Sequence, residues 1–192
     1  MAAPKILVIP GSLRSGSHNV KLAMAAAYEF AQAGVDVTRI SLGDYTLPIY
    51  DGDLQAKSGV PKNAVNLKRM MGAHHGVVIV TPEYNSSIPA LVKNTIDWIT
   101  RVQDPHESRG QIFREKPFAI AAASQGRLGG TRALAALRLI LSACHATVVP
   151  NQLALSFADQ AYDDMDRLKK EADIEALKAL VTQLIEVSQR MM

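Results

Sequence analysis

Short aliphatic runs alternate with longer helical patterns along this chain, and that alternation restricts its fold more than any other feature. The runs predict buried strands over Lys5–Ile9, Val35–Ile40, Gly76–Thr81, Phe118–Ala123 and Ala146–Val149, the last closed by Pro150. Between them, apolar residues at three- and four-residue spacing predict helices over 18–33, 62–71, 88–102, 131–144 and 166–188. Five strands alternating with five helices predict an α/β fold with a doubly wound parallel sheet and helices on both faces.

The composition is that of a single globular domain over residues 1–192, with 48% hydrophobic and 20% charged residues. The only cysteine, Cys144, cannot form a disulfide within the chain, which fits a reducing compartment such as the cytoplasm. No apolar stretch approaches the ~20 residues that cross a bilayer, and Met1–Lys5 does not begin a secretory signal. A net charge of +3 is too small and too scattered to indicate nucleic acid. We therefore expect neither a membrane nor a nucleic-acid partner.

Three polar loops follow the first, third and fourth predicted strands: Pro10–Asn19, Pro82–Ile88 and Ser124–Gly130. In doubly wound sheets, ligands bind beyond the carboxyl ends of the strands, where the strand order reverses. These loops are also the most unusual stretches of the sequence in composition. The fold and the composition therefore select the same loops as the candidate ligand site.

The first loop has the composition of an anion site. It places Ser12, Arg14, Ser17 and Asn19 between a buried strand and the start of a helix. A helix N-terminus offers unpaired N–H groups and a partial positive charge, and a guanidinium can meet two phosphate oxygens. For Arg14 we favour contact with an anion, whereas turn formation and helix capping explain Ser17 and Asn19 equally well.

Several competing motifs are absent from the sequence. No Lys-Ser or Lys-Thr completes a P-loop, Gly11 and Gly16 do not form a dinucleotide fingerprint, and there is no Gly-x-Ser-x-Gly elbow. A cysteine-dependent phosphatase is disfavoured because Cys144 lies far from the first loop in sequence. The first loop is therefore predicted to bind a phosphate monoester and to leave it intact.

The other two loops suit a planar ring but also have simpler explanations. Between two prolines the second loop carries an aromatic ring, an amide and two hydroxyls, which suit a planar ligand. The same residues are also typical of a helix start capped by Ser86 or Ser87. For Glu83 in this loop two interpretations are open: an acid or base, or a solvated loop carboxylate, which is the commoner case. The glycines of the third loop either let a ligand approach the backbone closely or form a tight turn.

Together, the loops resemble the flavodoxin-like NADPH-dependent FMN reductases, a family that includes quinone, azo-dye and chromate reductases. The motifs are Gly11-Ser12-Leu13-Arg14-x-x-Ser17-x-Asn19, Pro82-Glu83-Tyr84-Asn85-x-Ser87-x-Pro89-x-x-x-Lys93-Asn94-x-Ile96-Asp97-Trp98, and Gly126-x-x-Gly129-Gly130 before a helix with Arg132. The resemblance implies a flavodoxin-like sheet with strand order 2-1-3-4-5. Ser86 departs from the family, which often has a bulky residue there, and this implies a wider pocket.

The resemblance also implies an FMN site and its chemistry. The phosphate would be held by Ser12, Arg14, Ser17 and Asn19, with His18 contributing at most its backbone. The isoalloxazine would be bordered, chiefly by main-chain atoms, by Pro82, Glu83, Tyr84 and Asn85, and its pyrimidine side by Ser124, Gln125 and Gly126. Hydride would pass from NADPH or NADH to flavin N5, and two electrons would then leave to a quinone, azo compound, chromate or free flavin. The two half-reactions would follow a ping-pong sequence, without a catalytic side chain or a metal.

Two other functions remain open at this point. One is a flavin reductase that supplies reduced FMN to a partner, and the other is a flavodoxin-like electron carrier, which the +3 charge disfavours. The resemblance further implies a homodimer or homotetramer, with Lys93, Asn94, Asp97 and Trp98 structural or part of a subunit contact. The connection Leu42–Pro61 is longer than an ordinary loop, so we expect it to cover the cleft or a neighbouring subunit.

Overall fold

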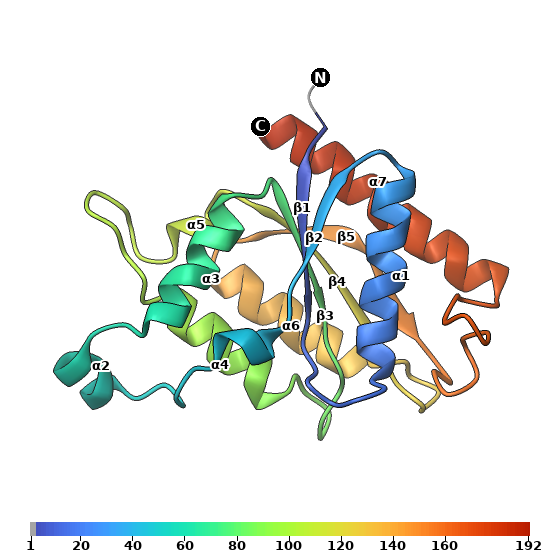
Figure 1. Ribbon diagram of the computed structural model, residues 1–192, viewed down its shortest axis with the longest axis horizontal. Coiled ribbons are helices and arrows are strands. Elements are labelled where there is room, and N and C mark those ends of the chain that lie inside the picture. Colours follow the sequence, from blue (N-terminus) through green and yellow to red (C-terminus); the bar gives the residue numbers. More distant parts are fainter. Residues whose placement is uncertain (1–2) are drawn as a thin grey trace.

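The computed structural model describes residues 3–192 and contains a five-stranded parallel sheet (Figure 1). Met1 and Ala2, with which the expected domain and the N-terminal segment begin, lie outside the described residues. The strands are β1 (Lys5–Pro10), β2 (Asp36–Arg39), β3 (Gly76–Val80), β4 (Pro117–Ala123) and β5 (Thr147–Leu155). They are arranged in the order β2-β1-β3-β4-β5, and every neighbouring pair is parallel. The predicted doubly wound order is confirmed.

Helices cover both faces of this sheet (Figure 1). One face carries α1 (His18–Gln32) and α7 (Glu171–Met191), and the other carries α3 (Lys62–Gly72), α4 (Ala90–Ile99) and α6 (Thr131–Ala143). Neighbouring side chains of a strand point to opposite faces, so Ile6 and Val8 join the first core whereas Leu7 and Ile9 join the second. Burial on both faces explains why these strands are continuous aliphatic runs in the sequence. Within residues 3–192, no helix is both long and apolar enough to cross a membrane.

Strand β5 continues well past Val149, where the sequence predicted its end. Its pairing with β4 shifts from Phe118 opposite Val148 to Ile120 opposite Gln152, so β5 holds extra residues around Pro150. Because β5 is an edge strand and bulged at this point, the missing N–H of Pro150 costs no ladder bond. The prediction that Pro150 closes the strand was wrong, and β5 carries the chain on to the carboxyl edge of the sheet.

The connection between β2 and α3 contains more structure than its sequence suggested. It forms a 3-10 turn, η1 (Leu42–Tyr45), and a short helix, α2 (Gly52–Ser58). Asn94 of α4 accepts from the Tyr50 N–H at 2.8 Å, and the buried indole of Trp98 donates to the Pro48 carbonyl at 2.7 Å. Asn94 and Trp98 therefore hold this connection against α4.

The start of the last helix and the segment before β4 also differ from the prediction. The last helix begins at Glu171 rather than at Asp166, whose φ of 60° lies outside the right-handed helical region. A short helix, α5 (Gln111–Arg114), precedes β4 and was not predicted.

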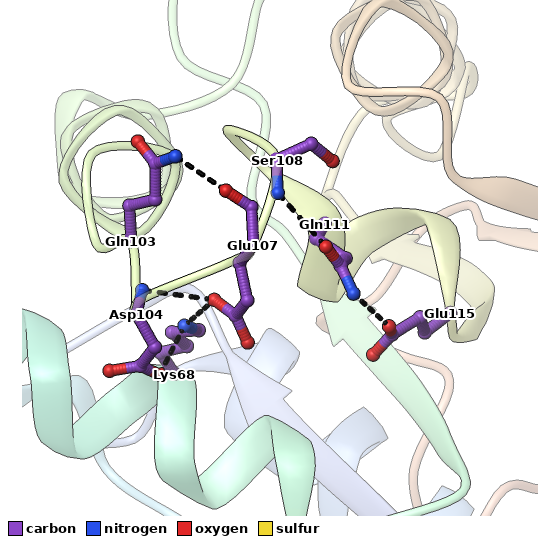
Figure 2. A network of polar contacts seen from close by, with 7 residues as sticks. All are labelled: Lys68, Gln103, Asp104, Glu107, Ser108, Gln111 and Glu115. Atoms are coloured by element: carbon purple, nitrogen blue, oxygen red, sulfur yellow. Dashed lines mark hydrogen bonds and ion pairs between the residues drawn. The ribbon is translucent and has the colours of Figure 1, made fainter.

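A buried lysine fixes the segment between α4 and α5. The Lys68 side chain, on α3, is 7% exposed, and its ammonium pairs with Asp104 at 2.6 Å and with Glu107 (Figure 2). Glu107 also accepts from the Asp104 N–H at 3.1 Å. The segment follows the C-terminal end of α4, so this network lies at the amino edge of the sheet, opposite the candidate site (Figure 1).

Candidate functional site

The loops that follow β1, β3 and β4 meet at the carboxyl edge of the sheet, at the bottom of Figure 1. The Gly11 N–H donates to the carbonyl of Val80 at 2.7 Å, which joins the first loop to the end of β3. His18 Nε2 lies 3.4 Å from Gln125 Nε2, which brings the first and third loops into contact. The structure thus places the three loops selected from the sequence side by side.

The first loop presents unused backbone donors. Ser17 caps α1 through a bond from the Asn19 N–H at 3.2 Å, and Ser12 Oγ accepts from the Arg14 N–H at 3.3 Å. Both serines are buried. In the part of the chain that the structure describes, several N–H groups of this loop have no acceptor, among them those of Leu13, Ser15, Gly16 and His18. Since the N-terminus of α1 also carries partial positive charge, these donors suit an anion.

Arg14 lies over the same loop with its side chain exposed. Its guanidinium donates to the carbonyls of Ser15 at 3.3 Å and Gly16 at 3.4 Å. Both bonds are long, and charge-assisted bonds to a phosphate would be shorter and stronger. Arg14 is therefore able to turn from its own loop to an anion.

Asn19 is engaged inside the protein. Its Nδ2 donates to the Ala123 carbonyl at 2.9 Å, and its Oδ1 accepts from the Ala123 N–H at 2.8 Å. These two bonds join the first turn of α1 to the end of β4. Both ends of the Asn19 side-chain amide are thus occupied within the protein, so Asn19 positions the first loop, and its expected contact with a phosphate stays a prediction.

The second loop makes a tight turn after β3. The Tyr84 N–H donates to the Ser87 carbonyl at 2.9 Å, and the Ser87 N–H returns a bond to Tyr84 at 3.1 Å. Asn85 and Ser86 between them have φ of 51° and 66°, the left-handed combination of a type I′ turn. Among residues 3–192 their own N–H groups have no acceptor, so the turn offers them to a ligand. Pro82 is buried at the base of the loop, and the Tyr84 side chain is 52% exposed.

Glu83 points away from solvent to the start of α6. Its side chain is 7% exposed and accepts from the N–H groups of Arg132 at 3.1 Å and Ala133 at 3.3 Å. The Arg132 guanidinium also pairs with it, with Nε at 2.8 Å. Gly130, the N-cap residue of α6, has no side chain to cap the helix, and Glu83 supplies that cap from another loop. The interpretation of Glu83 as a solvated carboxylate was therefore wrong.

The glycines of the third loop have different roles. Gly129 and Gly130 have φ of 60° and 92°, and a Cβ on them would lie 2.5 Å from the Ala154 carbonyl oxygen and 2.6 Å from the Ala122 Cβ. Both glycines are required by the turn itself. A Cβ on Gly126 would meet nothing closer than Ser124 Oγ at 3.7 Å, so the backbone at Gly126 is open to a ligand.

The segment after β5 forms a fourth wall that sequence reasoning missed. The Ala158 N–H donates to the Ser124 carbonyl at 3.0 Å, and Ser156 Oγ donates to that of Arg127 at 2.7 Å. Phe157 between them is 45% exposed at a φ of 49°. The buried pair Leu153 and Leu155, at strand spacing beyond Pro150, was the available signal for this extension of β5.

The site as a whole suits a ligand with an anionic end and a planar body. The first loop brings together the side chains of Ser12, Arg14 and Ser17 with free N–H groups. The rest is lined by free N–H groups at Asn85 and Ser86 and by the uncrowded backbone of Gly126, whose own N–H donates to Ser124 Oγ. Donors of this kind bind phosphate oxygens and the heteroatoms of a flat ring.

Comparison with known proteins agrees with this geometry. The family model described as NADPH-dependent FMN reductase matches residues 4–160, a range that includes all three loops. The chain is 38% identical over 146 residues to a quinone reductase of Escherichia coli (strain K12), covering 76% of this chain and 73% of the relative. It is 37% identical over 167 residues to an NAD(P)H-dependent FMN reductase of Pseudomonas aeruginosa, covering 85% and 84% of the two chains.

A solved structure extends the likeness to the C-terminal helix. FerB, a flavoenzyme NAD(P)H:(acceptor) oxidoreductase from Paracoccus denitrificans, matches with a TM-score of 0.81 at 27% identity, over 98% of this chain and 99% of that one. Helix α7, which lies beyond the residues matched by the family model, therefore belongs to the shared fold.

Proposed function

This chain belongs to the family of NADPH-dependent FMN reductases, and we propose that it reduces quinones and similar small acceptors by two electrons, with its two substrates using the carboxyl-edge site in turn. The protein is an NAD(P)H-dependent oxidoreductase with FMN as its cofactor. When bound, FMN supplies the redox chemistry by taking a hydride from NAD(P)H and passing two electrons to an acceptor.

The groups at the site fit FMN, which joins a phosphate monoester to a planar ring through a ribityl chain. For the phosphate we propose the hydroxyls of Ser12 and Ser17, the Arg14 guanidinium and the free N–H groups of the first loop. For the ring we propose main-chain contacts from the second and third loops: Pro82, Glu83, Tyr84, Asn85, Ser124, Gln125 and Gly126. Asn19 and the Glu83 carboxylate shape this site from behind.

The proposal rests on which polar groups of the site are free and which are already bonded within the protein. Free backbone N–H groups line the first and second loops, and Glu83, the single carboxylate in the three loops, is engaged by α6. Fixed N–H donors from these loops would stabilise negative charge on a bound flavin ring, without a proton-transferring side chain. Acceptors need only reach the cofactor, which supports a broad range that includes quinones, azo compounds, chromate and free flavin.

The alternating use of one site predicts ping-pong kinetics. Initial rates measured against NADPH at several fixed quinone concentrations should give parallel double-reciprocal lines. Intersecting lines would require both substrates to be bound together and would overturn this part of the proposal.

The absorbance of the purified protein tests the function directly. We expect a visible flavin spectrum that bleaches when NADPH is added without air and recovers when a quinone follows. A colourless protein that also fails to take up added FMN would contradict the proposal. Repeating the reduction with NADH in place of NADPH would identify the preferred reductant.

The two alternative functions are separated by the fate of the reduced cofactor. Gel filtration under anaerobic conditions after NADPH reduction should leave FMN with the protein. FMN in the small-molecule fraction would indicate a reductase that supplies reduced flavin to a partner. Very slow oxidation of NADPH in the presence of quinone would indicate a flavodoxin-like carrier.

We extend the proposal to assembly and location. Leu139 is 72% exposed on the outer face of α6, one helical turn from the exposed Ala135 and Ala143, which supports self-association into a homodimer or homotetramer. Sedimentation velocity would measure the assembly. The single Cys144 supports residence in the cytoplasm, which fractionation of the source cells would test.

A further inference from the structure

His18, the first residue of α1, is held at the edge of the first loop by groups from two other segments. Its ring stacks in parallel on that of Tyr162, with centroids 6.3 Å apart and planes 2° apart. The Tyr162 hydroxyl donates to the His18 carbonyl at 2.8 Å. On the other side, His18 Nε2 lies 3.4 Å from Gln125 Nε2 of the third loop. The imidazole is therefore fixed beside the unused donors of the first loop.

The charges around His18 oppose its protonation. Burial, Arg14 of the first loop and Lys21 of α1 lower the pKa of His18 below its ordinary value, against a smaller opposite effect of Asp159 from the segment after β5. Lys21 also pairs with Asp166 at 2.5 Å and lies 5.7 Å from the centre of the Tyr162 ring. In the protein without a bound anion, His18 is accordingly neutral at pH 7.

Neutral His18 leaves one polar atom unused. The Gln125 amide donates to Nε2, which places the single ring proton on Nδ1. Nδ1 is buried, and no residue in 3–192 forms a hydrogen bond with it. A dianion in the first loop would offset Arg14 and Lys21 and favour the imidazolium, and the Gln125 amide would turn its oxygen toward the Nε2 proton.

We propose that His18 is a proton-linked specificity residue, which takes up a proton from solvent when a phosphate monoester dianion occupies the first loop. The site therefore prefers phosphorylated to unphosphorylated flavin, and this preference is larger at pH 6 than at pH 8. The inference rests on the proposed function, because it takes the first loop as the phosphate site.

The test compares FMN with riboflavin, which lacks the phosphate. Dissociation constants are measured by quenching of flavin fluorescence on the apoprotein at pH 6, 7 and 8. His18→Phe keeps a ring against Tyr162 and cannot titrate, and His18→Gln is a second non-titrating variant. His145→Asn, at an exposed histidine after α6, is the matched control. Protonation of the FMN phosphate, whose pKa is about 6, affects all four proteins equally.

We expect the preference for FMN over riboflavin to grow from pH 8 to pH 6. This growth should be roughly three- to tenfold larger in the native protein and His145→Asn than in the two His18 variants, since one pKa unit corresponds to a tenfold change. An NMR titration should also show a higher pKa of His18 with FMN bound than without it.

Equal pH dependence in the native protein and both His18 variants would overturn the inference, as would a pKa of His18 that FMN leaves unchanged. Riboflavin bound as tightly as FMN at every pH would overturn it through the phosphate assignment. An apoprotein that binds neither flavin would instead overturn the proposed function.

Discussion

Glu83 and Arg132, 49 residues apart in sequence, join the second loop to the start of α6. Glu83 accepts from two backbone N–H groups of α6 and pairs with the Arg132 side chain. Because the third loop leads directly into α6, this contact fixes the second and third loops relative to each other. The proposed ring contacts depend on the separation of these two loops, which is thus set by a carboxylate that faces the start of α6.

Replacing Glu83 should therefore affect both stability and cofactor retention. Glu83→Ala removes the cap of α6, and loss of a helix cap costs about 1 kcal/mol of unfolding free energy. We also expect FMN affinity to fall roughly three- to tenfold, because the loops lose their fixed separation. Urea unfolding and flavin fluorescence measure the two effects.

Arg132→Ala is the matched comparison for Glu83→Ala. It removes the 55% exposed partner of the ion pair but keeps both backbone bonds to Glu83, so its effects should be smaller. Equal losses in the two variants would mean that the ion pair, rather than the cap, carries the contact.

Arg14→Ala should weaken FMN binding about 10- to 100-fold while leaving riboflavin binding unchanged. The reason is the loss of charge-assisted bonds to the phosphate, which contribute roughly 1.5–3 kcal/mol. Arg190→Ala, near the end of α7, is a control for the change in net charge. An Arg14→Ala protein that keeps FMN as tightly as the native protein would remove Arg14 from the phosphate site.

Ser86→Gly should stabilise the fold by about 0.5–1 kcal/mol. Ser86 has a φ of 66°, a conformation that costs a residue with a Cβ about 1 kcal/mol or more and costs glycine little. Ser87→Gly, one residue later and outside the left-handed pair, should give no gain. Chemical unfolding of the three proteins decides the matter, and a destabilised Ser86→Gly would mean that the Ser86 side chain has a role of its own.

The alternation of short aliphatic runs with helical patterns was enough to predict the sheet, because strands buried on both faces leave a continuous apolar signal. Pro150 misled the prediction since proline ends a central strand but is tolerated at a bulge in an edge strand. The same error hid Phe157 and Tyr162. Asn19 and Glu83 were recognised as members of the site, but their bonds within the protein were not predicted, because their partners Ala123 and Arg132 are distant in sequence. Local composition reports which residues gather at a loop and not which atoms they bond.

Variants of the Lys68 network should differ according to which charge they leave behind. Lys68→Met keeps the buried stem of the side chain and removes its charge, so we expect a modest fall in the unfolding temperature. The double variant Asp104→Asn/Glu107→Gln leaves the ammonium buried without a charged partner and should lower the unfolding temperature further. FMN binding should be unchanged in both, because the segment that pairs with Lys68 follows α4 at the opposite edge of the sheet (Figure 1). A more stable double variant than Lys68→Met would contradict this account.

Stability should fall as the pH drops below about 6.5, in part through His75. Its Nδ1 accepts from the Lys5 N–H at 2.8 Å, which requires an unprotonated nitrogen. Burial, together with Lys116, Lys5 and His74, lowers the pKa of His75 in the folded protein from its ordinary 6.5. Above pH 6.5, His75 is neutral in the folded and unfolded chains, and its contribution is complete. Below it, the unfolded chain takes up the proton first, so stability is lost until the pH reaches the lower pKa of the folded state.

His75→Asn isolates this contribution, because an amide oxygen can accept from the Lys5 N–H at every pH and does not titrate. Urea unfolding at pH 8, 7, 6 and 5 should show a steeper loss of stability in the native protein than in the variant. The pKa of His18 is also lowered, so His18 too makes the protein less stable as the pH falls. His18 is present in both proteins, so the difference between the two curves belongs to His75. Parallel curves would show that the Lys5 contact tolerates the imidazolium, and the decline would then arise at other groups whose pKa is lowered, His18 and Asp163 among them.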